Sequence, residues 1–344
     1  MKTEQICPHS VKVLEFDLIL DTLASFASSD LGKKAAKRIT PSTQRPWIEK
    51  RLGETSQLKA LLDQGVRLPL SGLRDIGPRI RDLGLKQTLF EPEDLIEISD
   101  TLSVSGQMKR FLGRLSVADS PLLRAMGDKL HSFEDLTRRI NHCIDGSEGV
   151  LDRATEPLQS IRRQLRVLEG EIRRQFSRIV SDPQMRSALE NDNFMLRHGR
   201  PVVAVKSHYR TRLRGTVLDR SHSGATLYIQ PDGLVELSNQ LEETRFAEKK
   251  EIDNILWDLT HRVLARRDDI FDTLRNLAFV DLTYAKARFS TDYEMSAPHL
   301  GDSLRLNSAR HPLLLQWASA EYDRPVRELD QHVIPISPRL GDDF

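Results

Sequence analysis

The sequence predicts a mainly α protein with one small β insert, which places it in the α+β class. Apolar residues recur at helical spacings of three and four along most of the 344 residues. One segment, 194–231, instead alternates with a period of two and is rich in Arg, Lys and His. A hydrophobic content of 39% allows a substantial core and more than one domain.

Residues 11–145 are expected to form a helical domain of short amphipathic helices. The first apolar pattern runs through 13–26, and after a break at 41–43 a second runs through 48–62. Residues 68–76 are expected to form a loop. Pro92 and its acidic neighbours suit the first turn of a helix that continues to Phe111. The apolar stripes of these helices are interpreted as core.

A longer helix is predicted from about residue 155, and Ser181-Asp182-Pro183 marks its end. Its apolar positions form a seam like that of a coiled coil, and at 1.5 Å per residue the helix is roughly 40 Å long. The seam consists of Leu158, Ile161, Leu165, Leu168, Ile172, Phe176 and Ile179. A second long helix follows the insert, over 234–263. Because each stripe needs a partner, the two are expected to form an antiparallel hairpin. A further helix through 270–280 would return to the base.

The last part of the chain has a different residue pattern. Residues 303–306 and 332–336 are expected to be short strands on either side of 309–314. No helix is expected to close this piece. Residues 300–344 are therefore interpreted as the opening of a further domain that the sequence does not complete.

The insert contains a local excess of basic side chains. Overall, 51 basic and 50 acidic side chains leave a formal charge of only +1, so contact with a polyanion requires local clustering. Between 197 and 220, seven Arg or Lys residues face a single Asp, which gives +6 before histidines are counted. A strand is expected at 202–205 after a turn at 199–201, residues 213–218 can pair back, and another strand is expected at 227–229.

Cationic side chains on such strands can neutralise phosphates, and Tyr and His can stack on unpaired bases. The predicted nucleic-acid-binding residues are Arg197, Arg200, Lys206, His208, Tyr209, Arg210, Arg212, Arg214 and His222. The alternative is a solvated edge strand whose charges only prevent aggregation. The position of the insert at the end of a hairpin favours nucleic acid.

Other chemistries find little support. Residues 221–226 suit a turn better than a catalytic serine, and no histidines have metal-ligand spacing, so no catalytic or metal site is expected. The Gly-x-x-x-x-Gly-Lys-Ser/Thr motif is absent. Cys7 and Cys143 are not expected to pair, which suits a reducing cytosol. No apolar run approaches the roughly 18 residues of a membrane span, so a soluble, cytoplasmic protein is expected.

Several segments, in order along the chain, form a recognisable set. They are Phe16-Asp17-Leu18-Ile19-Leu20, Leu68-Pro69-Leu70-Ser71-Gly72-Leu73-Arg74-Asp75-Ile76, Gly199-Arg200-Pro201-Val202-Val203-Ala204-Val205-Lys206, Gly215-Thr216-Val217-Leu218-Asp219, Ser223-Gly224-Ala225-Thr226-Leu227-Tyr228-Ile229-Gln230-Pro231 and Ala309-Arg310-His311-Pro312-Leu313-Leu314. These segments resemble the second-type bacterial MutS family (MutS-two), described as endonucleases and recombination suppressors. The Ser-Gly-Ala-Thr-Leu run is the most specific of them.

The resemblance implies five parts. They are a helical core domain at 1–150, an ascending lever helix at 151–190, a β-rich clamp at 191–233, a descending lever helix with return to the core at 234–298, and the beginning of a MutS-type P-loop ATPase domain at 299–344. Within the last part, Val333, Ile334 and Pro335 match the segment that lies against the adenine.

The resemblance also implies function. Members of the family dimerise, use ATP and Mg²⁺, bind branched or mismatched DNA and suppress homologous recombination, and some act on collided ribosomes, hence rRNA. The family's Walker A loop and Smr nuclease module would follow residue 344. Without phosphate-binding amides, residues 1–344 alone are expected to hold no cofactor, to hydrolyse no ATP and to cut no nucleic acid. No membrane partner is expected.

Two alternatives stay open. The hairpin can be a coiled-coil module that docks a protein partner, in which case the apolar seam should extend onto exposed faces. The chain can also be a truncated, non-catalytic product, whose incomplete domain would expose apolar surface.

Overall fold

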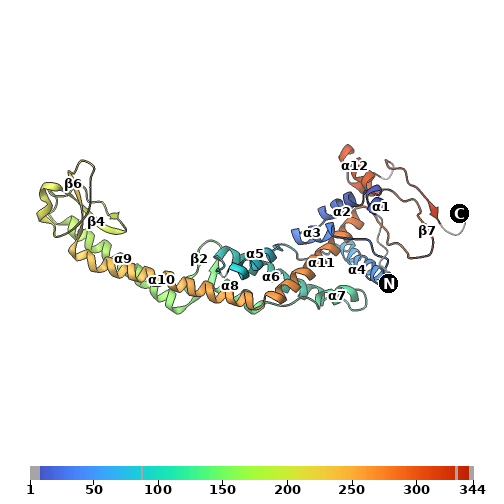
Figure 1. The fold of residues 1–344 in the computed structure, drawn as a ribbon, viewed down its shortest axis with the longest axis horizontal. Coiled ribbons are helices and arrows are strands. Elements are labelled where there is room, and N and C mark those ends of the chain that lie inside the picture. Colours follow the sequence, from blue (N-terminus) through green and yellow to red (C-terminus); the bar gives the residue numbers. More distant parts are fainter. Residues whose placement is uncertain (1–7, 87, 330–331, 341–344) are drawn as a thin grey trace. The chain divides into compact units, whose positions relative to one another are not determined.

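The computed structural model of the protein describes residues 8–86, 88–329 and 332–340. Helices dominate this part of the chain and the strands are short and antiparallel, so the prediction of a mainly α protein with a small β part is confirmed. The chain divides into two compact units. The first takes its described residues from 1–88, 94–138 and 262–344, and the second from 89–93 and 139–261 (Figure 1).

The first unit is helical and is organised around its longest helix, α11. Its elements are α1 (Pro8–Val13), α2 (Phe16–Ser25), α3 (Asp30–Lys37), α4 (Arg45–Asp63), α5 (Gly77–Lys86), most of α6 (Pro92–Gly113), α7 (Pro121–Gly127), β7 (Leu304–Arg305), α11 (Arg267–Asp292), α12 (Pro312–Tyr322) and β8 (Arg339–Leu340). Helix α11 contacts α2, α3, α4 and α5. Leu277 and Val280 of α11 share a core with Leu58 and Met108. These buried stripes agree with the interpretation as core.

The predicted pattern through 13–26 is interrupted in the structure. Glu15 takes a left-handed backbone conformation with φ of 52°, so α1 ends at Val13 and α2 begins at Phe16. The helices expected at 48–62 and from Pro92 to Phe111 are present as α4 and α6. No described helix is long and apolar enough to cross a membrane. Cys143 is buried, and Cys7 lies outside the described residues.

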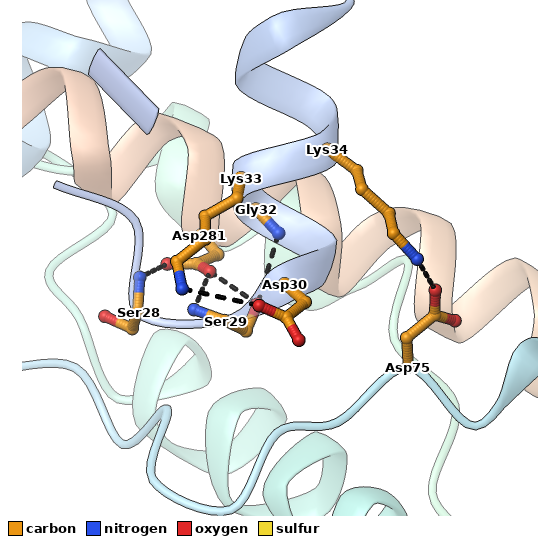
Figure 2. A network of polar contacts seen from close by, with 8 residues as sticks. All are labelled: Ser28, Ser29, Asp30, Gly32, Lys33, Lys34, Asp75 and Asp281. Carbon is orange, nitrogen blue, oxygen red and sulfur yellow. Dashed lines mark hydrogen bonds and ion pairs between the residues drawn. The ribbon is translucent and has the colours of Figure 1, made fainter. Parts of the chain in front are cut away.

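A buried carboxylate fixes the start of α3 against α11 (Figure 2). Asp281 of α11 has no exposed surface and accepts hydrogen bonds from the backbone N–H of Ser28 at 2.9 Å and of Ser29 at 2.8 Å. The Ser29 hydroxyl donates to Asp281 at 2.6 Å and accepts from the backbone N–H of Gly32 at 3.1 Å. A side chain at Gly32 would collide with the Asp281 carboxylate. The network therefore caps α3 and requires glycine at its first turn.

The second unit contains a helical hairpin and a four-stranded sheet. Its elements are part of α8 (Glu134–Cys143), β1 (Ile144–Asp145), β2 (Gly149–Val150), α9 (Glu156–Ser181), β3 (Met195–Arg197), β4 (Arg200–Lys206), β5 (Gly215–Arg220), β6 (Thr226–Pro231) and most of α10 (Asp232–Ala265). Arg162 of α9 bonds Glu248 of α10 at 2.7 Å. Glu169, which comes later in α9, bonds Arg245, which comes earlier in α10, at 3.3 Å. The two predicted long helices thus run antiparallel.

The sheet has the strand order β3-β4-β6-β5 and is antiparallel throughout. The expectation that 213–218 pairs back onto the strand at 202–205 is wrong. Strand β6 takes one edge of β4, while β3 and Leu189 take the other, so β5 pairs with β6 instead. The β3–β4 turn consists of His198 and Gly199, both with positive φ, and not of 199–201. This is the pattern of a two-residue hairpin turn, which favours glycine.

The C-terminal segment differs from its prediction. Strand β7 pairs with β8 at 339–340, and the expected strand at 332–336 contributes only a single bridge between Ile336 and Ala309. A helix that was not predicted, α12, follows 309–311. Pro312 suits its first turn, and its apolar face covers a small core. That core consists of Leu315, Ala318, Leu329 and Val333.

Candidate nucleic-acid interface

The β-module, defined here as residues 185–231, shares one core with the hairpin. Val203 and Val205 of β4 and Ile229 of β6 are fully buried against apolar residues of both helices. The helical contributors are Leu165, Leu168, Ile172 and Phe176 of α9 and Leu234 and Leu241 of α10. One face of the sheet is therefore fixed on the hairpin, and the side chains at the strand ends and on the loops are left to face outward.

Four of the predicted binding residues already form ion pairs or hydrogen bonds with residues of the β-module or with Gln184 directly before it. Arg197 pairs with Asp219 at 3.1 Å and lies over the Tyr228 ring, 4.3 Å from its centroid. Arg200 donates to the Gln230 side chain at 3.3 Å. The other two, Arg210 and Arg212, bind backbone.

Arg210 and Arg212 hold the loop between β4 and β5. Arg210 donates to the carbonyl oxygens of Leu213 at 3.0 Å and Gly215 at 2.7 Å. Arg212 donates to the Gln184 carbonyl at 3.1 Å and to the Ser187 hydroxyl at 2.9 Å. These arginines satisfy carbonyl groups that strands and helices leave without partners, so at least part of their role is structural.

Two cations and two histidines lie at one end of the sheet, on strands β4 and β5 or the loops that follow them, with β6 between the two strands. We call this group the basic sheet end: Lys206, His208, Arg220 and His222. Strand β4 ends at Lys206, opposite Thr226, and β5 ends at Arg220, opposite Leu227. The backbone N–H of Ser207 bonds the Ala225 carbonyl at 2.8 Å, which joins the two loops that carry the histidines. Within the described residues, none of the four side chains forms an ion pair or hydrogen bond.

The remaining predicted side chains lie elsewhere. Arg214 is exposed at the opposite end of the sheet, next to the Gly215–Pro231 pair, and has no side-chain partner among the described residues. Tyr209 is half-buried in the core between the His208 ring, at 4.2 Å, and the Arg212 guanidinium, at 4.7 Å. Its ring thus already contacts His208 and Arg212, and His208 is the more exposed of the two residues.

The loop at 221–225 is a turn, as predicted from its Gly-Ala-Thr sequence. The Ser221 hydroxyl accepts from the Thr226 N–H at 3.0 Å, and Gly224 has a positive φ of 71°. The described residues contain no group of three or more His, Cys, Asp or Glu placed to hold a metal ion.

Sequence reasoning missed two contributors near the module. Arg220 was counted in the basic run but not among the binding residues, because nothing in the sequence shows that it lies at the same end of the sheet as Lys206. Arg173 of α9 lies 5.5 Å from the centroid of Phe194, whose ring is 38% exposed. The hint in the sequence is a Phe directly before a basic strand, next to a helix face rich in arginine.

One ion-pair cluster connects the first turns of α9 to α10 and to the residues before α9. Arg162 bridges Asp152 and Glu248, each at 2.7 Å, and Arg166 reaches Asp152 at 3.3 Å. The hydrogen bond from Arg162 outweighs the effect of burial and holds the pKa of Asp152 below its ordinary value.

The three predicted adenine-side residues, in the first unit, have different environments. Val333 is buried in the small core beneath α12, and its carbonyl accepts from Arg310 at 3.2 Å. Ile334 is 87% exposed, and Pro335 is exposed as well. Only the latter two side chains are accessible to a ligand.

No protein-family model matches the sequence. Curated relatives do. The chain is 35% identical over 336 residues to an endonuclease MutS2 of Geobacillus sp. (strain WCH70), covering 96% of this chain and 41% of that protein. It is 34% identical over 308 residues to the putative endonuclease MutS2 of Bacillus subtilis (strain 168), covering 88% and 39%. A Symbiobacterium thermophilum endonuclease MutS2 is 32% identical over 308 residues, with 89% and 38% covered. The chain thus spans about two fifths of the length of these relatives.

Proposed function

This chain belongs to the MutS2 family, and on that premise we propose that its second unit is the DNA-binding part of a larger MutS2-type protein. In this proposal α9 and α10 are the lever helices, and the β-module is the clamp that contacts the backbone of branched DNA. The relatives are named endonucleases, enzymes that cleave within nucleic acid chains. ATP and Mg²⁺, homodimerisation and recombination suppression are proposed for the intact protein.

The observation that carries the proposal is the basic sheet end. Lys206 and Arg220 end the two strands on either side of β6 and have no carboxylate partner in the described chain, whereas Arg197, Arg210 and Arg212 are engaged. Unpaired cations on rigid strands can bind phosphates without first breaking an internal ion pair. Phosphate contacts position a protein on nucleic acid without reading sequence, which suits a target defined by its shape.

The test is the affinity of the purified chain for a four-way DNA junction, measured by fluorescence anisotropy. We expect the double variant Lys206→Glu/Arg220→Glu to bind at least tenfold more weakly at low salt, because two attractive contacts become repulsive. The control is Lys50→Glu/Arg114→Glu, an equal charge reversal at exposed residues of the first unit whose side chains have no partner in the described structure.

Unchanged affinity of the Lys206/Arg220 variant, or an equal loss in the control, would move binding away from the basic sheet end. The same measurement on a folded RNA of equal charge distinguishes branched DNA from rRNA, the two targets that the family resemblance implies. A clear preference for the RNA would favour a ribosomal substrate over branched DNA.

A second candidate function, docking of a protein partner on the hairpin, is favoured by its exposed apolar residues. Phe246 is 73% exposed and Trp257 58% exposed on α10, and eleven residues place them on the same face of the helix. Val167 of α9 is 51% exposed. If this face docks a partner, Phe246→Ser/Trp257→Ser should abolish co-purification of that partner and leave junction binding unchanged.

A further inference from the structure

The first unit contains an apolar cavity of about 340 Å³ between α2, α4 and α11. Aromatic and aliphatic side chains form most of its wall, among them Leu23, Trp47, Leu52, Phe289 and Met295. Small-molecule sites typically occupy about 300–1,000 Å³ and combine an apolar wall with few polar groups. At about 30 Å³ per water-sized group, the cavity holds roughly eleven such groups.

Two cations reach this cavity, Arg51 of α4 and Lys286 of α11. Arg51 donates through Nη1 to Glu54 at 2.7 Å and lies over the Phe279 ring, 3.9 Å from its centroid. Its Nε is buried and has no hydrogen-bond partner among the described residues. In the described part of the chain, the Lys286 ammonium makes neither a hydrogen bond nor an ion pair.

The charges around Lys286 do not balance. Among the described residues, Glu54, 2% exposed, is the carboxylate whose charge raises the pKa of Lys286, and it is already bonded to Arg51. Burial, and then the charge of Arg51, lower the pKa of Lys286. Two cations therefore reach an apolar cavity, while Glu54 is bonded to Arg51, so one further negative charge would compensate the Lys286 ammonium.

We propose that this cavity binds a small aromatic carboxylate. Its carboxylate accepts a hydrogen bond from the Lys286 ammonium, and its ring packs against the apolar wall that includes Trp47 and Phe289. The size of the cavity matches a single substituted ring better than a nucleotide. The site is separate from the basic sheet end and does not depend on the DNA-binding proposal.

The probes are indole-3-acetate and its uncharged analogue indole-3-acetamide, titrated into the chain by isothermal calorimetry. The two have nearly the same shape and differ in charge. We expect the carboxylate to bind at least tenfold more tightly than the amide. Lys286→Met keeps an unbranched side chain, one atom shorter, and removes its charge. It should lower the affinity for the carboxylate at least tenfold while the affinity for the amide stays within twofold.

Lys50→Met, an exposed lysine on the same helix as Arg51, is the matched control and should leave both affinities unchanged. Equal affinity for the two probes, absence of binding by either, or a carboxylate preference that survives Lys286→Met would each overturn the proposal. If Lys286→Met does not fold, the comparison of the two probes on the unaltered chain decides the question.

Discussion

Asp281 in the first unit and the basic sheet end in the second use charge in opposite ways. The Asp281 carboxylate is fully buried and accepts hydrogen bonds from Ser28 and Ser29, so its charge is satisfied within the fold. Lys206 and Arg220 are held by strand register alone, and their side chains form no internal bond in the described structure. Charge at Asp281 should therefore determine stability, and charge at the basic sheet end should determine binding.

The largest effect is expected from Asp281→Ala, which tests the first half of that comparison. The substitution leaves two backbone N–H groups and the Ser29 hydroxyl without their acceptor and opens a cavity beside α3. We expect a loss of about 3–5 kcal/mol in the free energy of unfolding, measured with urea. Asp281→Asn keeps one acceptor and should cost less. A loss below about 1 kcal/mol for Asp281→Ala would show that the network is not structural.

Gly32→Ala tests the same network by crowding it. The added methyl group would collide with the Asp281 carboxylate, so α3 or α11 must shift, at a cost of about 1–3 kcal/mol in unfolding free energy. The control is Gly106→Ala in α6, where the new Cβ would meet only Arg110 at 3.6 Å. The control should be neutral or stabilise by up to about 1 kcal/mol, because alanine favours helix. Equal effects at the two glycines would contradict this account.

The Asp152–Arg162 pair predicts a smaller, pH-dependent effect in the second unit. The folded-state pKa of Asp152 is lowered, first by the hydrogen bond from Arg162, so the pair stabilises the fold above the unfolded-state pKa. That stabilisation is lost as the pH falls through the lowered folded-state pKa. A carboxyl NMR titration should show the pKa of Asp152 returning toward its ordinary value in Arg162→Met. An unchanged pKa would assign the shift to another group.

The smallest effect on stability is expected at the basic sheet end. Lys206→Gln/Arg220→Gln removes two charges that have no partner among the described residues, so the free energy of unfolding should change by no more than about 0.5 kcal/mol. A matched urea titration of Arg210→Gln should show a clear loss, because Arg210 binds two backbone carbonyl groups. If both variants were equally destabilised, Lys206 and Arg220 would have a structural role that the described contacts do not show.

The sequence predicted elements whose signal is local. The seam from Leu158 to Phe176 and the alternation at 202–205 identified α9 and β4, because burial against one partner imposes a fixed period. The strand order could not be predicted from the sequence, because no local pattern distinguishes pairing of residues 213–218 with β6 from pairing with β4. Helix α12 was missed because it begins with three consecutive leucines, which show no helical period, although Leu314 is exposed and only Leu313 and Leu315 are buried.

The candidate site was predicted by composition but not by arrangement. The sequence counts Arg197, Arg210 and Arg212 as equal to Lys206, since all are basic residues of one run. The structure separates them by their partners, because Asp219 and the Gln184 carbonyl come close only after the strands and the preceding loop have folded. For the same reason Asp281, in an otherwise apolar helix segment, gave no sign of its role.

The salt dependence of binding to a four-way DNA junction tests the central claim most directly. For the unaltered chain, the logarithm of the association constant should fall linearly with the logarithm of salt concentration, with a slope of about −0.9 for each phosphate contact. We predict that Lys206→Gln/Arg220→Gln makes this slope shallower by about 2, while Lys50→Gln/Arg114→Gln leaves it unchanged. Identical slopes for the unaltered chain and the Lys206/Arg220 variant would contradict the assignment of DNA binding to the basic sheet end.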